Sequence, residues 1–199
     1  MIHQYIKKED KNTLILLHGT GGNESDLIPI ASFIDSKASL LGIRGNVLES
    51  GMPRFFKRLA FGVFDQESLK QESHTLYHFI NECAKTYDFD LNEVTVIGYS
   101  NGANILAYML MHFPLHIKKA MMLHPMVPSR ALPTVKNHIT KSLITAGQHD
   151  AMVPMEQSLE LKKIFDEMSL NTELKTFDSG HQLTQDELTY LKSWYEKRA

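Results

Sequence analysis

The sequence has few cysteines, no excess of basic residues and no long apolar run, the features that mark disulfide-rich, nucleic-acid-binding and membrane proteins. Cys83 is the only cysteine among 199 residues, so no disulfide forms within the chain, and a reducing compartment is favoured. Lys and Arg number 21 against 23 Asp and Glu, a net charge of −2, which argues against a protein dedicated to nucleic acid or to a membrane surface. The longest apolar run, 105–111, is far shorter than the ~20 residues that span a bilayer. We see no targeting segment and expect a cytoplasmic protein with neither a membrane span nor a nucleic-acid partner.

What is present is the composition of a globular protein. Hydrophobic residues make up 43% of the chain and charged residues 22%, which is unlike the composition of disordered chains. There is no internal repeat, no low-complexity tract and no linker-like segment. We therefore expect a single domain over residues 1–199 that folds without a disulfide or a structural metal.

Short apolar segments alternate with longer segments of helical periodicity. Continuous apolar runs predict strands buried on both faces, and strands alternating with helices predict parallel pairing. The pattern predicts an α/β fold of three layers, with a mostly parallel central sheet, helices on both faces and no large cap domain. The expected strands are 13–17, 39–43, 94–97, 120–123, 142–145 and 172–177, and the expected helices are 27–34, 67–87, 104–113, 155–168 and 184–197.

The segment after the strand at 94–97 carries the strongest chemical signal. Gly98-Tyr99-Ser100-Asn101-Gly102 is a G-x-S-x-G pattern between a strand and a helix. Such a sharp turn presents the serine hydroxyl at its tip, and glycines on both sides let strand and helix approach closely. The alternative is a tight turn without chemistry, but the strand–turn–helix setting favours Ser100 as a nucleophile.

A serine nucleophile needs a base and an acid that orients the base. Asp150 follows the strand at 142–145 and His181 follows the strand at 172–177. Ser100, Asp150 and His181 thus occur in the order serine, acid, histidine, each just past a separate strand. Asp178 is a rival acid, but it lies only three residues before His181; His149 is a rival base, but it adjoins Asp150 and is expected to be a loop residue.

An oxyanion hole requires two backbone N–H donors near the nucleophile. We expect one from Asn101, the residue after Ser100, and one from Thr20 in the glycine-rich segment after the strand at 13–17. That segment also suggests a phosphate cradle. Glu24, however, stands where G-x-G-x-x-G needs its last glycine, and the chain has no G-K-[ST] sequence.

These motifs together resemble the α/β-hydrolase superfamily, and more narrowly its small carboxylesterase/phospholipase group of acyl-protein thioesterase-like and dienelactone-hydrolase-like enzymes. The matching segments are 17–22, 98–103, 147–154 and 180–181. The resemblance covers nearly the whole chain and implies an α/β-hydrolase fold. Segment 44–56 is most similar to the bacterial esterase branch linked with hydroquinone and quinone stress. True dienelactone hydrolases carry cysteine at the turn where this chain has Ser100, which argues against that activity.

The substrate pocket is expected near the loop from Met52 to Phe64, although core packing is an equal alternative for each phenylalanine. Arg54, Lys57 and Arg58 in the same loop could meet an anionic group, but a solvated surface is favoured for all three. His74 and His78 have helical spacing without the glutamate of H-E-x-x-H or further ligands, so we expect no metal and no cofactor. The candidate lining residues are Met52, Phe55, Phe56, Met126, Met152 and Val153.

The sequence favours a cofactor-independent serine carboxylesterase that hydrolyses small to medium acyl esters through an acyl-Ser100 intermediate. An acyl thioesterase or lysophospholipase would use the same residues on longer chains. A binding protein on a hydrolase scaffold is the alternative from another class. The expected partner is a small-molecule ester; the oligomeric state stays open, and a homodimer is compatible with the sequence.

Overall fold

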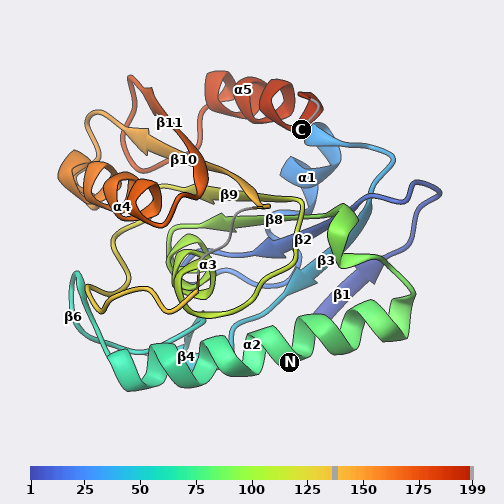
Figure 1. Cartoon of the computed structure of the whole chain (residues 1–199), viewed down its shortest axis with the longest axis horizontal. Coiled ribbons are helices and arrows are strands. Elements are labelled where there is room, and N and C mark those ends of the chain that lie inside the picture. Colours follow the sequence, from blue (N-terminus) through green and yellow to red (C-terminus); the bar gives the residue numbers. More distant parts are fainter. Residues whose placement is uncertain (136–138, 198–199) are drawn as a thin grey trace.

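A seven-stranded sheet forms the centre of the computed structural model, which describes residues 1–135 and 139–197. The strand order is β1-β3-β2-β8-β9-β10-β11 (Figure 1). Only β1 runs antiparallel, against β3; the other neighbouring strands are parallel. The strands are β1 (His3–Ile6), β2 (Thr13–Leu17), β3 (Ser39–Ile43), β8 (Val94–Tyr99), β9 (Lys119–Leu123), β10 (Lys141–Gly147) and β11 (Asn171–Phe177).

Helices cover both faces of this sheet. Figure 1 shows α1 and α5 on one side and α2 and α3 on the other. The helices are α1 (Ile28–Ile34), α2 (Gln66–Tyr87), α3 (Asn101–His112), α4 (Met155–Glu167) and α5 (Gln185–Glu196), with a short 3₁₀ helix, η1 (Leu91–Glu93). The predicted three-layer α/β architecture is confirmed. The largest shift is at α3, which begins three residues earlier than its periodicity predicts, directly after Ser100.

Alternate residues of the buried strands pack against the helices on opposite faces of the sheet. Leu14 and Leu16 of β2 pack in the cluster that includes α1 and α5. Ile15 and Leu17 pack in the cluster that includes α2, α3 and α4. All five residues of β2 are buried, as the continuous apolar run predicts. Parallel strands end at one edge of the sheet, so the segments after β2, β8, β9, β10 and β11 meet there.

The segment between β3 and α2 differs from the predicted loop. It forms two antiparallel hairpins, β4 (Val47–Glu49) with β5 (Met52–Arg54), and β6 (Arg58–Ala60) with β7 (Val63–Phe64). Strands of two or three residues are too short to show a period, which is why the sequence did not reveal them. In the part of the chain that the structure describes, these two hairpins are the regular elements between β3 and α2. Among the described residues, no large cap domain covers the carboxyl edge of the sheet.

None of the described helices is both long enough and apolar enough to cross a membrane.

Candidate active site

Ser100 lies at the tip of the turn between β8 and α3. Its φ of 51° and ψ of −110° are unusual for a residue with a side chain. The flanking glycines make the turn feasible: a Cβ on Gly98 would lie 2.5 Å from the carbonyl oxygen of Gly102, and one on Gly102 would lie 2.1 Å from that of Leu17. The backbone N–H of Ser100 donates to the carbonyl of Leu123, which fixes the turn against β9.

Three side chains form a hydrogen-bonded chain across the ends of three strands. The Oγ of Ser100 lies 3.0 Å from Nε2 of His181, and Nδ1 of His181 lies 2.7 Å from Oδ2 of Asp150. The imidazole therefore carries its proton on Nδ1 when its Nε2 accepts from the serine hydroxyl. This is the arrangement in which a histidine takes up a serine proton while a carboxylate holds its orientation.

The Asp150 carboxylate is buried and held by several donors. Its Oδ1 accepts the backbone N–H groups of Met152 and Val153, each at 2.8 Å. Burial would raise the pKa of Asp150, but the hydrogen bonds from His181, from these two N–H groups and from His124 outweigh it and lower the pKa. Asp150 is therefore ionised at neutral pH and stabilises a protonated His181.

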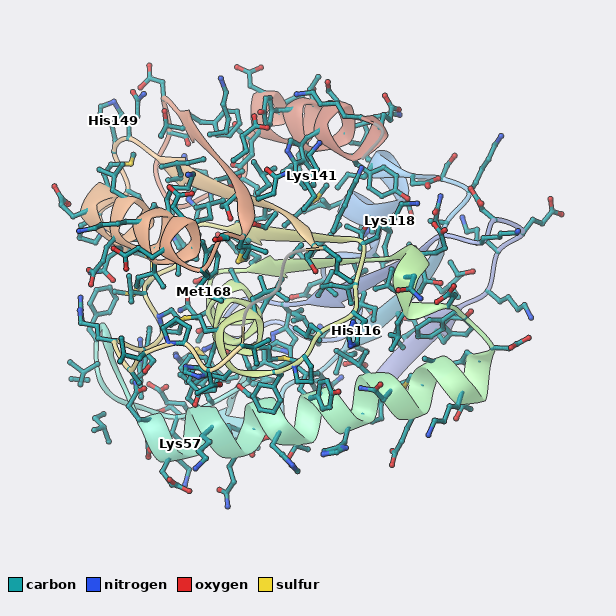
Figure 2. All side chains as sticks on the ribbon, in the orientation of Figure 1. Lys57, His116, Lys118, Lys141, His149 and Met168 are labelled. Atoms are coloured by element: carbon teal, nitrogen blue, oxygen red, sulfur yellow. The ribbon has the colours of Figure 1, made fainter. Side chains whose placement is uncertain are left out.

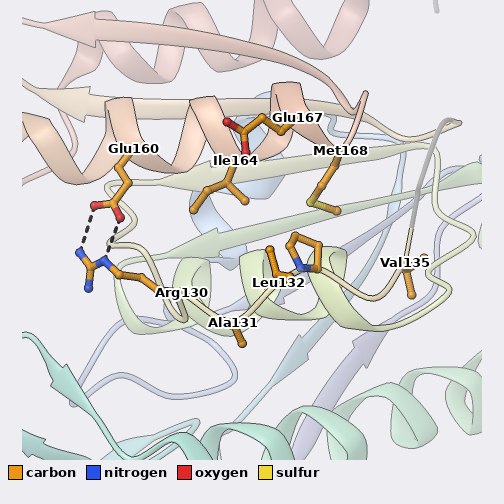
Figure 3. A pocket seen from close by; sticks show the side chains of 9 residues that line it. Arg130, Ala131, Leu132, Val135, Glu160, Ile164, Glu167 and Met168 are labelled. Carbon is orange, nitrogen blue, oxygen red and sulfur yellow. Dashed lines mark hydrogen bonds and ion pairs between the residues drawn. The ribbon is translucent and has the colours of Figure 1, made fainter.

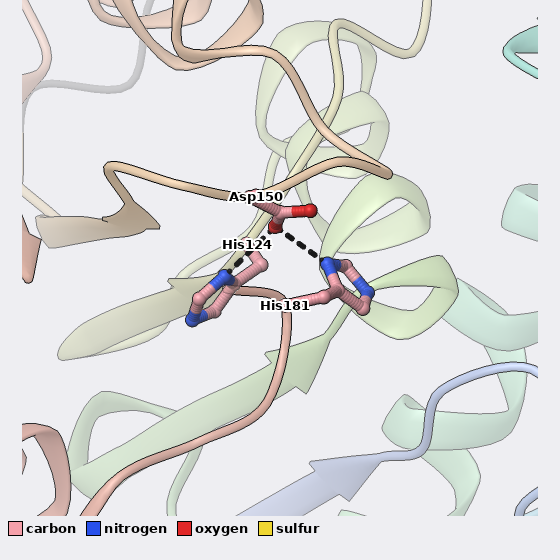
Figure 4. A group of neighbouring side chains, drawn as sticks. All are labelled: His124, Asp150 and His181. Carbon is pink, nitrogen blue, oxygen red and sulfur yellow. Dashed lines mark hydrogen bonds and ion pairs between the residues drawn. The ribbon is translucent and has the colours of Figure 1, made fainter. Parts of the chain in front are cut away.

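His124, directly after β9, is a site residue that the sequence reasoning missed. Its Nδ1 lies 3.2 Å from Oδ2 of Asp150, so the carboxylate is shared between His124 and His181 (Figure 4). Its Nε2 lies 3.1 Å from Oε2 of Glu187, and both His124 and Glu187 are completely buried. A ring that faces a carboxylate at each nitrogen can donate to both only when it is protonated. Burial would lower the pKa of His124, but Glu187 and Asp150 together raise it.

Both residues carry a signal in the sequence, although neither was predicted to belong to the site. His124 follows a predicted strand, which is the same position that selected Ser100, Asp150 and His181. Glu187 stands three residues after Thr184, as in a helix-capping pattern. Its backbone N–H does bond the Thr184 hydroxyl, but its side chain reaches His124 instead of the helix end.

Tyr99 supports the histidine from the other side. Its hydroxyl donates to the backbone carbonyl of His181 at 2.9 Å, and the two rings pack with centroids 5.4 Å apart. Burial, with the nearby charges of Asp150 and Glu187, raises the pKa of Tyr99 to about 12. The Tyr99 hydroxyl therefore stays protonated at neutral pH and keeps donating this hydrogen bond.

A narrow cleft of about 40 Å³ opens beside Ser100. Thr20 and Asn101 line it, and among the described residues no group accepts a hydrogen bond from the backbone N–H of either. The Asn101 side chain is used elsewhere, since its Oδ1 accepts the N–H of Phe55 at 2.7 Å. The N–H of Asn101 lies at the start of α3 and that of Thr20 in the turn after β2. Two free backbone N–H groups beside a nucleophile are suited to binding an oxyanion.

The six predicted pocket residues fall into three groups. Met126, Met152 and Val153 line the cleft with Ser100. Phe55 and Phe56 are completely buried in the core, which is the alternative that the sequence left open. Met52 is 41% exposed and does not border the cleft; its side chain lies near Gly21.

The prediction that Arg54 lies on a solvated surface is wrong. Its side chain is only 3% exposed and lines the cleft, because the β4–β5 hairpin turns it inward. Arg58 is partly buried and also lines the cleft, whereas Lys57 is exposed at the periphery (Figure 2).

The rival residues lie elsewhere. Nε2 of His149 is 2.8 Å from Oδ1 of Asp178, and both side chains are largely exposed; Figure 2 shows His149 at the edge of the molecule. Nε2 of His78 and Nε2 of His74 lie 3.0 Å apart on the exposed side of α2. Within the described ranges, the one group of three side chains close enough to share a metal ion is His124, Asp150 and His181, whose contacts are the hydrogen bonds given above.

A larger cavity of about 410 Å³ lies between α4 and the segment around Arg130 to Val135 (Figure 3). Leu132, Ile164 and Met168 form its apolar part, and Arg130 pairs with Glu160 at its rim. It shares no lining residue with the Ser100 cleft.

The chain is similar to known proteins over nearly its whole length. The phospholipase/carboxylesterase family matches residues 4–198. The chain belongs to the phospholipase/carboxylesterase family. MhqD of Bacillus subtilis (strain 168), which bears the name of a hydrolase, is 45% identical over 197 residues, 99% of this chain and 98% of that protein.

Two solved structures are similar to this chain over nearly its whole length. The Bacillus cereus carboxylesterase matches with a TM-score of 0.94 and 45% identity, over 98% of this chain and 92% of that one. YahD, solved with malic acid, matches with a TM-score of 0.92 and 31% identity, over 97% of both chains. The protein is therefore a carboxylesterase-like hydrolase with an α/β-hydrolase fold.

Proposed function

We propose that this hydrolase is a serine carboxylesterase that cleaves small esters through an acyl-Ser100 intermediate. The observation that carries the proposal is the hydrogen-bonded chain from Ser100 through His181 to Asp150, with free N–H groups beside it. A protein that only binds its ligand has no use for a base on the serine hydroxyl.

The reaction follows from these contacts. His181 takes the Ser100 proton at Nε2 while Oγ attacks the ester carbonyl, and Asp150 stabilises the imidazolium that forms. The N–H groups of Thr20 and Asn101 bind the oxyanion. His181 then protonates the leaving alcohol, and the ester C–O bond breaks to leave an acyl-serine. A water molecule, deprotonated by His181, attacks the acyl-serine; the bond between the acyl carbon and Oγ breaks, His181 returns the proton to Oγ, and the acid is released.

The size of the cleft supports small acyl groups. A space of about 40 Å³ is far below the ~300–1,000 Å³ of typical ligand pockets. Phe61 and Met126 border it, so a long acyl chain would have to displace them. This favours a small-ester hydrolase over the acyl thioesterase or lysophospholipase alternative.

The test is hydrolysis of p-nitrophenyl esters from acetate to decanoate by the parent protein and by Ser100→Ala. We expect the highest kcat/KM on the short esters and a loss of ~10³-fold or more in the variant. Higher turnover of long esters would favour the lipid-type alternative. A folded parent protein without turnover, whose ligand binding survives Ser100→Ala, would favour the binding protein.

A further inference from the structure

The wall of the Ser100 cleft carries positive charge that ester hydrolysis alone does not require. The Arg54 side chain is nearly buried there, in a cleft that the apolar side chains of Phe64 and Met126 also line. Burying such a charge is unfavourable unless it is paired. The partners of Arg54 therefore indicate what its charge can do.

One carboxylate is shared by two arginines at this wall. Oε2 of Glu49 lies 3.2 Å from Nε of Arg54, and Oε1 of Glu49 lies 2.8 Å from Nε of Arg58. The described lining of the cleft contains no Asp or Glu, and the carboxylate of Asp150 is already bonded to two histidines and two N–H groups. The wall therefore has one positive charge in excess.

Arg54 is also fixed relative to the reacting atoms. Its Nη1 donates to Oγ1 of Thr20 at 3.0 Å, and its Nε donates to the carbonyl of Phe56 at 3.3 Å. The next residue, Phe55, bonds the side chain of Asn101. The guanidinium is thus bonded to Thr20, one residue of the proposed oxyanion site, and the neighbouring backbone is bonded to Asn101, the other. Among the described residues, its Nη2 has no hydrogen-bond partner and is free to donate.

We propose that the substrate is a small ester bearing a carboxylate, which pairs with Arg54 and the adjoining Arg58 while Ser100 attacks the ester carbonyl. A planar guanidinium matches a carboxylate by charge and by geometry. The small cleft restricts the ester to a compact skeleton, such as a monoester of a four-carbon dicarboxylic acid. The inference rests on the proposed function and names its substrate class.

The test compares esters of the same shape with and without charge. Methyl hydrogen succinate is paired with methyl levulinate, its neutral isostere with a methyl ketone, and acetoxyacetate is paired with acetoxyacetone. The first pair carries the charge on the acyl side and the second on the alcohol side. We expect the parent protein to favour the anionic member of at least one pair by about 10- to 100-fold in kcat/KM. The pair that shows the preference identifies the side of the ester that carries the carboxylate.

Two variants test whether the charge of Arg54 sets the preference for anionic esters, and they should change that preference in opposite directions. Arg54→Met should lower the anionic-to-neutral ratio at least about tenfold, whereas Glu49→Gln, which removes the competing carboxylate, should raise it. Glu49→Gln keeps the proposal testable if Arg54→Met does not fold. Arg130→Met is the matched control: it removes an arginine paired with Glu160 outside the cleft, and should leave the ratio unchanged.

The outcomes separate the two proposals. If no ester in either pair is hydrolysed by the folded parent protein, the proposed function fails. If the neutral esters are hydrolysed as fast as the anionic ones, or if Glu49→Gln and Arg54→Met both leave the ratio unchanged, the esterase stands and the carboxylate inference is overturned.

Discussion

The buried pair behind Asp150 gives a prediction about stability. Replacing His124 with leucine removes the contacts at 3.2 Å to Asp150 and at 3.1 Å to Glu187. Asp150 keeps its bonds to His181 and to two N–H groups. Glu187 keeps no side-chain partner among the described residues, since its Oε1 already lacks one and the side chain is completely buried. The single variant therefore leaves a charge stranded in the core.

We expect His124→Leu to lose about 3–5 kcal/mol of unfolding free energy, the usual cost of breaking a buried ionic pair. Replacing both partners removes the stranded charge, so His124→Leu/Glu187→Leu should be more stable than the sum of the two single losses predicts, by about 2 kcal/mol. Urea unfolding of the four proteins at pH 7 gives the coupling free energy. Additive losses would refute the assignment of an ionic pair.

The same pair predicts a pH dependence. The pKa of His124 is raised in the folded protein, so its contribution to stability is fully present below the unfolded pKa of about 6.5 and is lost as pH rises through the folded pKa. The melting temperature of the parent protein should fall as pH rises above about 6.5 and through the folded pKa of His124, and that of the double variant should fall less. Parallel curves for the two proteins would contradict the account.

The remaining predictions concern the nucleophile turn and its surroundings. Asp150→Asn should lower kcat by about 10³–10⁴-fold with little change in KM, measured on a short ester, because the amide disfavours the reactive tautomer of His181; a loss below tenfold would contradict the role of the acid. Gly102→Ala should cost at least about 4 kcal/mol or prevent folding, measured by thermal unfolding, because its Cβ would lie 2.1 Å from a backbone oxygen; near-parent stability would show that the turn can relax. Asn101→Ala should cost about 1–3 kcal/mol, because the buried N–H of Phe55 loses its acceptor; urea unfolding checks this, and an unchanged midpoint and slope would contradict it.

Much of the fold was predictable because buried parallel strands leave a strong signal. Continuous apolar runs identified β2, β3, β8, β9 and β10, and helical periodicity identified the five helices. β11 was also predicted, although its sequence is largely polar and its residues are only partly buried or exposed. β1 was missed because only four residues at the edge of the sheet form it, with mixed burial. The hairpins β4–β7 were missed because their pairing depends on contacts with the rest of the molecule more than on local pattern.

The candidate site was predictable where each residue follows a strand. Ser100, Asp150 and His181 were selected by that rule, and the structure brings their side chains within hydrogen-bonding distance. Arg54 was assigned to the surface because charged residues usually lie there. Only the fold of the β4–β5 hairpin shows that its side chain turns toward the cleft.

The most direct test of the central claim is to map the site of covalent reaction. The parent protein, Ser100→Ala and His181→Ala are treated with a fluorophosphonate, and the adduct is located by intact-mass and peptide mass spectrometry. The account predicts one adduct per chain, on Ser100, with none in Ser100→Ala and greatly slowed labelling in His181→Ala. A parent protein that stays unlabelled while folded, or an adduct on another serine, would contradict the assignment of Ser100 as the nucleophile.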